Sequence, residues 1–124
     1  MDLKIIYEDA QLLVCRKPAG VATQTKRLGQ QDMESLLKNY RASKGEPSYI
    51  GVVHRLDQPV EGVMVFAKTK EAASDLSRQV QMKEADKFYY AVTDGVPVEK
   101  TGSLEDYLLR DGRTNTSKVV KEGT

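Results

Sequence analysis

The sequence is poor in the residues on which disulfide, zinc and membrane proteins depend. Its 124 residues include one cysteine, one histidine and no tryptophan. A lone cysteine excludes an internal disulfide and fits a reducing compartment, and one cysteine with one histidine is too few ligands for the usual zinc site. No apolar run approaches the ~20 residues of a membrane helix, and the first residues show no secretory signal. We therefore expect a cytoplasmic protein with no metal and no membrane contact.

Strong net charge and cofactor motifs are also absent. The net charge is +1, which gives no overall nucleic-acid footprint, and no phosphate loop or dinucleotide motif predicts a nucleotide cofactor. Charge is nevertheless uneven along the chain, because residues 16–44 hold seven cations and two carboxylates, a local balance of +5. This segment is either a modest basic patch or a solvated face, and the charge pattern leaves both open.

The length predicts one compact domain, since domains commonly have about 100–150 residues. Helical spacing predicts a helix over 32–43, with Asp32 as N-cap and Gly45 as terminator, and a second over 70–84 with Thr69 as N-cap. β-prone runs predict strands, the first two joined as a hairpin, over 4–7, 12–15, 49–53, 62–67, 87–92, 103–109 and 117–120. The elements alternate without a strict βαβ rhythm, so we expect an α+β fold with a mixed, mainly antiparallel sheet and flanking helices.

The most informative segment covers residues 54–69, where a polar stretch separates two apolar strands. Polar residues at the mouth of buried strands are a common place for active sites. If residues 55–57 are extended, Arg55 and Asp57 share one face, and the arginine favours an ionised carboxylate that can act as nucleophile or base. The alternative is an ordinary ion pair that fastens the loop. Spacing alone leaves both interpretations open.

Several stretches of this chain match one family in order. Residues 54–57 read H-R-L-D, residues 62–69 read G-V-M-V-F-A-K-T, residues 17–20 read K-P-A-G, and residues 87–92 read K-F-Y-Y-A-V. Together they resemble the signature of the RluA-type family of RNA pseudouridine synthases. The resemblance implies a pseudouridine synthase fold and an isomerase that converts uridine to pseudouridine in ribosomal or transfer RNA, with no metal or organic cofactor.

The resemblance also implies roles for three residues. Asp57 would be the catalytic residue, attacking ribose C1′ or initiating proton loss at C2′. Tyr89 would stack on the extruded base, and Arg55 would fill the vacated space in the RNA or pair with phosphate. One carboxylate is chemically adequate, because an isomerase that retains its base admits no water, whereas hydrolytic glycosidases usually need two.

Three further residues, His54, Lys17 and Lys87, are expected RNA contacts. Several candidates have a structural alternative: Tyr89 as a core tyrosine, His54 as a loop histidine hydrogen-bonded to the backbone, and Lys17 as a solvated turn residue. Cys15 lies in an apolar run and is expected to be a small buried side chain.

The chain departs from the family pattern in two places. Residues 58–62 read Q-P-V-E-G where the family has x-x-T-S-G, and Glu61 would repel phosphate along the expected RNA path. The family's later motif, T-G-R-x-H-Q-I-R, does not occur in these residues, and we expect no S4-like module. Residues 1–124 are therefore expected to form the amino-terminal part of a catalytic domain. Alone, this part would be inactive or weakly active, with an unpaired sheet edge that favours self-association.

Three functions from different classes stay open. The leading one is a pseudouridine synthase with Asp57 as nucleophile. The second is a catalytically silent RNA-binding paralogue, suggested by residues 60–61. The third is an N-glycoside hydrolase that uses Asp57 and Glu61 as its carboxylate pair.

Overall fold

The computed structural model describes residues 3–123. Although the length predicts one domain, the contacts between residues group the chain into two compact units, Met1–Phe88 and Tyr89–Thr124. Each unit is described by itself. No helix in the described residues is both long and apolar enough to cross a membrane.

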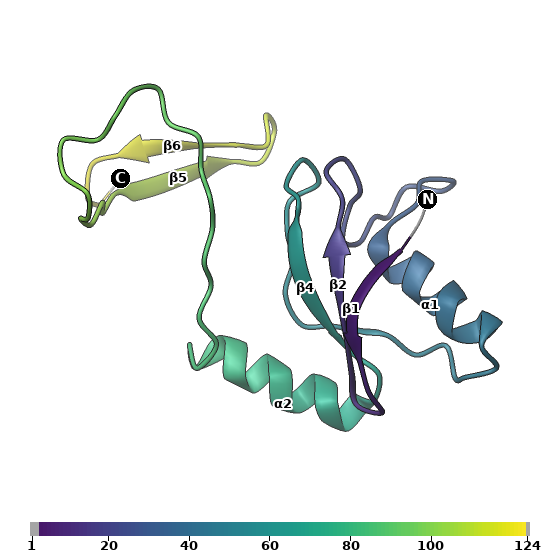
Figure 1. Ribbon diagram of the computed structural model, residues 1–124. Helices are drawn as coiled ribbons and strands as arrows, with labels where there is room; N and C mark the ends of the chain where they lie inside the picture. Colours follow the sequence, from purple (N-terminus) through teal and green to yellow (C-terminus); the bar gives the residue numbers. More distant parts are fainter. Residues whose placement is uncertain (1–2, 124) are drawn as a thin grey trace. The chain divides into compact units, whose positions relative to one another are not determined.

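The first unit is built on a four-stranded antiparallel sheet in the order β1-β2-β4-β3 (Figure 1). The predicted hairpin and the strand over 62–67 are confirmed, whereas the strand expected over 49–53 is only two residues long. The strands are β1 (Lys4–Glu8), β2 (Leu12–Lys17), β3 (Gly51–Val52) and β4 (Gly62–Ala67). β2 and β4 are therefore the central strands, and β3 leaves the sheet after pairing with only the last two residues of β4.

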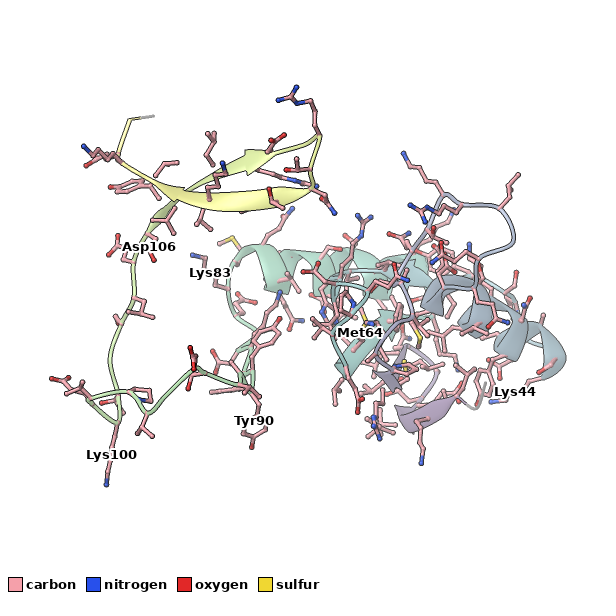
Figure 2. The ribbon with its side chains drawn as sticks, turned by 90° about the horizontal axis from the view of Figure 1, so that it is seen from above. Lys44, Met64, Lys83, Tyr90, Lys100 and Asp106 are labelled. Carbon is pink, nitrogen blue, oxygen red and sulfur yellow. The ribbon has the colours of Figure 1, made fainter. Side chains whose placement is uncertain are left out.

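The core lies between this sheet and the first helix, α1 (Met33–Ser43), which Figure 1 shows beside the sheet. Alternate residues of the central strands point to it, and Met64 is labelled among the packed side chains in Figure 2. The buried apolar side chains are Leu13, Cys15, Val21, Met33, Leu37, Ile50, Met64 and Phe66. The prediction of a buried Cys15 is confirmed, and desolvation by burial raises the pKa of its thiol to about 11.

Both helices begin at the predicted caps. Asp32 accepts a hydrogen bond from the N–H of Ser35 at 2.8 Å, and Thr69 accepts one from the N–H of Ala72 at 3.1 Å. The second helix, α2 (Lys70–Gln81), ends three residues before the predicted position 84. The helix does not reach position 84 because Lys83 has a left-handed backbone conformation, with φ 56°, which cannot continue a helix.

A network of ion pairs joins the end of α1 to the strands. Lys68 Nζ lies 2.7 Å from Glu8 Oε2 and 3.3 Å from Glu46 Oε1, and Arg41 Nε lies 3.2 Å from Glu46 Oε1. Lys44, at the end of α1 in Figure 2, also pairs with Glu46. Hydrogen bonds from Lys44 and then Lys68 lower the pKa of Glu46 to about 2. Each cation of this network is thus paired with at least one of the two carboxylates, Glu8 and Glu46.

The second unit contains one antiparallel hairpin, β5 (Tyr107–Asp111) and β6 (Thr116–Val120). The predicted strand at 117–120 is confirmed, while the strand expected at 103–109 begins four residues later. The strand predicted over 87–92 is wrong, because these residues are irregular and exposed. A β-prone run forms a strand only beside a hydrogen-bonded neighbour, and no described strand pairs with this run. Figure 2 shows Tyr90 and Lys100 spread along an open stretch of chain.

Candidate active site

The loop between β3 and β4, residues 53–61, carries the H-R-L-D tetrapeptide. Leu56 packs against the core, whereas Arg55 and Asp57 on either side of it are exposed. This alternation agrees with the extended conformation expected for residues 55–57. Arg55 and Asp57 form no ion pair within residues 3–123. The ion-pair interpretation of this spacing is therefore wrong, and the Asp57 carboxylate is left open to solvent.

His54 continues the sheet where β3 ends. Its Nε2 accepts a hydrogen bond from the N–H of Val65 in β4 at 3.1 Å. The imidazole thus takes the place of a backbone carbonyl of β3, which has already left the sheet at this point. Burial, and secondarily the charge of Lys87, lowers the pKa of this imidazole, so it is neutral near pH 7. The expected hydrogen bond between His54 and the backbone is confirmed. Its RNA-binding role stays a prediction, as does that of Lys87, which is exposed at the end of the first unit.

The backbone before Asp57 is held by a residue that the sequence analysis missed. The Thr23 hydroxyl donates to the carbonyl oxygen of Leu56 at 3.0 Å and accepts from the Leu56 N–H at 3.2 Å. Thr23 is buried in the apolar run 21–23, and a buried hydroxyl requires partners. That requirement is the signal that could have identified it.

The backbone after Asp57 is held from the same segment. The N–H of Gly20 donates to the carbonyl oxygen of Gln58 at 2.7 Å, and the Gln58 side-chain amide donates back to the Gly20 carbonyl at 3.0 Å. Gly20 has φ 90°, a conformation that favours glycine. The N–H of Val60 donates to the carbonyl of Asp57 itself at 2.9 Å, closing a turn. The peptide units around Asp57 are thus fixed while its carboxylate is exposed.

Lys17 supports the same turn from inside the fold. Its side chain is fully buried, and its ammonium donates to the carbonyls of Pro18, Val21 and Gln58 at 3.0, 2.6 and 3.0 Å. Burial lowers the pKa of Lys17, although the charges of Asp57 and Glu61 oppose the shift. Three protons for three carbonyls leave none for a phosphate. The expected RNA contact and the solvated-turn alternative are both replaced by a structural role.

Glu61 is paired rather than free. Its carboxylate forms an ion pair with the Arg16 guanidinium, and both side chains are about half exposed. The pair compensates the negative charge that was expected to repel phosphate beside Asp57. It also engages the carboxylate that a two-carboxylate hydrolase would need.

The basic segment 16–44 keeps few cations available. Arg16, Lys38, Arg41 and Lys44 are in ion pairs and Lys17 is bonded to carbonyls. Lys26 and Arg27 are exposed without an ion-pair partner in the part of the chain that the structure describes. They lie in a turn where the Arg27 N–H donates to the Thr25 hydroxyl at 3.1 Å. The basic-patch interpretation of this segment is therefore limited to this turn.

The site residues fall into both units. His54, Arg55, Asp57 and Lys17 lie together on the β3–β4 loop and the segment that holds it, in the first unit. Tyr89 is the first residue of the second unit and is 65% exposed, so the core-tyrosine alternative is wrong for this structure. Its stacking role stays a prediction.

Known proteins with similar sequences belong to one family. The family model described as RNA pseudouridylate synthase matches residues 11–124. The chain is 33% identical over 123 residues to an uncharacterized RNA pseudouridine synthase, YhcT, of Bacillus subtilis, covering 98% of this chain and 41% of that protein. It is 37% identical over 123 residues to ribosomal large subunit pseudouridine synthase D of Neisseria meningitidis, covering 97% and 32%.

Two further similarities extend this comparison. The chain is 32% identical over 113 residues to tRNA pseudouridine synthase C of Pasteurella multocida, covering 91% of this chain and 41% of the relative. The solved structure of human RNA pseudouridylate synthase domain containing 4 superposes with a TM-score of 0.55 at 26% identity, covering 65% of this chain and 30% of that one. The chain thus spans less than half the length of these relatives.

Proposed function

Because this chain belongs to the RNA pseudouridylate synthase family, we propose that it supplies the catalytic aspartate of an isomerase that converts uridine to pseudouridine in RNA. One observation carries the proposal. Asp57 projects an exposed carboxylate from a turn whose backbone is hydrogen-bonded on both sides. Relatives named for ribosomal and transfer RNA support one of these as the substrate class.

The chemistry asks little more of the protein than a positioned carboxylate. In one route, Asp57 attacks ribose C1′, a C1′–oxygen bond forms, and the C1′–N1 bond breaks with its electron pair on the uracil. The base then turns, C5 bonds to C1′, the carboxylate leaves, and the C5 proton is lost. In the other route, the carboxylate starts the reaction by removing the C2′ proton. Neither route needs water, so one carboxylate is enough, and holding it in place lowers the barrier.

The neighbouring residues have supporting roles in this proposal. Arg55 forms no ion pair with Asp57, so its guanidinium is available for a phosphate or for the space left by the flipped nucleotide. Tyr89 stacks on the extruded base. Lys87, Lys26 and Arg27 are exposed cations that can contact the phosphate backbone.

Two further parts of the proposal concern the 124 residues as a separate polypeptide. They span 41% of the Bacillus relative, which supports weak or absent turnover by this polypeptide alone. Exposed apolar side chains in the second unit, such as Tyr90, Val92 and Val98, support its self-association.

We also propose a cytoplasmic location for this protein. The single, buried Cys15 supports it, because a lone reduced cysteine fits a reducing compartment.

The decisive experiment is Asp57→Asn in the protein that carries this sequence. Tritium release from RNA labelled at uridine C5 should fall by at least about 1,000-fold, as for removal of other catalytic nucleophiles, while RNA binding is retained. Asp75→Asn is the matched control, because Asp75 is an exposed carboxylate on α2 that pairs with Arg78 of the same helix. An active Asp57→Asn variant would refute the assignment.

Analysis of the products of the same reaction, together with RNA binding, separates the competing functions. Isomerised uridine in the recovered RNA supports the synthase, and free uracil identifies an N-glycoside hydrolase. RNA binding without either product identifies a catalytically silent paralogue. Tritium release by residues 1–124 alone, compared with the protein that carries them, tests whether the shorter polypeptide is inactive; equal turnover would contradict that part of the proposal.

A further inference from the structure

A single hydroxyl satisfies both backbone polar groups of the residue before Asp57. Thr23 Oγ1 accepts from the Leu56 N–H at 3.2 Å and donates to the Leu56 carbonyl at 3.0 Å. A threonine hydroxyl has one proton to donate. The Leu56 carbonyl oxygen at 3.0 Å is the nearer acceptor, and the Met64 sulfur lies 3.7 Å away. Thr23 is 3% exposed, so water does not readily replace it. These two bonds connect the segment after β2 to the loop that carries the nucleophile.

Leu56 is also fixed through its side chain. It packs against the core, and Gly62 leaves the room for it, because a Cβ at Gly62 would lie 3.0 Å from Leu56 Cδ1. The side chain sets the depth of the loop, and Thr23 sets the orientation of the peptide groups. The direction in which the next residue, Asp57, leaves the backbone depends on both.

The bond pattern on the two sides of Asp57 is unequal. The carbonyl of Gln58 has two donors, the Gly20 N–H and the Lys17 ammonium, so loss of one leaves the other. The N–H and carbonyl of Leu56 have no hydrogen-bond partner except Thr23 among residues 3–123. Among residues 3–123, Thr23 is thus the one hydrogen-bond partner of the Leu56 backbone and has no substitute in that role.

We propose that Thr23 is a positioning residue for the Asp57 carboxylate, which rests on the catalytic role of Asp57 proposed above. Thr23 touches neither the carboxylate nor the substrate in this assignment and acts through Leu56. A misplacement of a reacting group by about 1 Å can cost on the order of 100-fold in rate. Removal of the hydroxyl should therefore lower kcat by about 10- to 100-fold. KM and RNA binding should change much less, since the RNA-facing side chains are intact.

The test compares three threonine substitutions in the protein that carries this sequence. Thr23→Val removes the hydroxyl and keeps the shape, and Thr23→Ser keeps the hydroxyl. Thr69→Val is the matched control, because the Thr69 hydroxyl also makes two hydrogen bonds. It accepts from the Ala72 N–H and donates to the Gln11 side chain, and it caps α2 without contacting the loop that carries Asp57. Tritium release is measured for each at a temperature where circular dichroism shows the native spectrum.

We expect kcat to fall for Thr23→Val and to be retained for Thr23→Ser. Thr69→Val should lower the thermal midpoint without lowering kcat, which separates a positioning role from a stabilising one. A folded Thr23→Val variant with parental kcat, beside an inactive Asp57→Asn, overturns this proposal alone. An active Asp57→Asn overturns the proposed function and this proposal with it.

Hydrogen exchange of the Leu56 amide provides a readout that does not require the valine variant to fold. In the parent and in Thr23→Ser, the amide should exchange slowly, as a hydrogen-bonded group does. Exchange at the rate of an unprotected amide would overturn the proposal, because the contact would then not be maintained in solution.

Discussion

Replacement of Lys17 by methionine should destabilise the first unit without creating a cavity. Methionine fills a similar volume but donates no hydrogen bond, so the three carbonyls that the ammonium contacts lose a donor. The Gln58 carbonyl keeps the Gly20 N–H at 2.7 Å, and the Pro18 carbonyl keeps a long bond of 3.5 Å from the Val21 N–H. The change therefore leaves one carbonyl without any described donor and a second poorly satisfied.

The magnitude follows from those two groups. An unsatisfied buried polar group costs about 1–3 kcal/mol. Removal of a buried ammonium also relieves its own desolvation, which offsets the loss of its stronger, charge-assisted bonds. The free energy of unfolding should thus fall by about 2–4 kcal/mol, from one to two poorly satisfied carbonyls.

Urea unfolding followed by circular dichroism measures this difference, provided that the dependence on urea is the same in parent and variant. Lys4→Met is the matched control, because Lys4 is an exposed lysine in the same unit. It should change the free energy of unfolding by no more than about 0.5 kcal/mol. A loss below about 1 kcal/mol for Lys17→Met would refute the view that the ammonium holds the loops together.

Three further predictions concern titration, reactivity and RNA contact. The ion pairs of Glu46 lower its pKa from 4.5 to about 2, so they contribute stability that is complete above pH 4.5 and lost as the pH falls toward 2. The urea midpoint should drop over this interval, and a Glu46→Gln variant with an equally steep drop would contradict the assignment. Because the pKa of Cys15 is raised to about 11, a thiol reagent at mildly alkaline pH should label the native protein only as fast as it unfolds, and rapid labelling without urea would exclude burial. Replacing Lys26 and Arg27 with alanine should lower the slope of log affinity for RNA against log salt by about 1.4, or 0.7 for each phosphate contact; Lys70→Ala, a control on α2, should leave the slope unchanged, and an unchanged slope in the double variant would exclude the contact.

The elements of the first unit were largely predictable because local signals and burial agree there. The caps at Asp32 and Thr69 fix the helix starts through their own side chains, so sequence reasoning finds them. In the strand over 62–67, the alternate residues Met64 and Phe66 point into the core, and the strand is paired with β2 on one side and β3 on the other. By contrast, residues 87–92 have the same β-prone composition but no described partner strand, and composition does not reveal pairing.

The site was predictable in part for a related reason. The exposed carboxylate of Asp57 was found from its place between two apolar strands and from the family signature. The charge of Lys17 suggested a surface role, since lysine is seldom fully buried, and only the fold reveals the three carbonyls around it. For Thr23 the sequence could at most suggest a buried hydroxyl in need of partners, and it could not name those partners, because they are backbone groups more than thirty residues away.

The turn after Asp57 is held in a way that makes the position of the Asp57 backbone independent of the side chains that follow it. The bonds to the Asp57 and Gln58 carbonyls come from main-chain N–H groups and from Lys17, and none of them uses the side chains of residues 59–61. Substitutions at residues 59–61 should therefore change the surface beside Asp57 and leave the hydrogen bonds that hold its backbone in place. For the proposed nucleophile, this means that the neighbouring surface can vary while the carboxylate stays where it is.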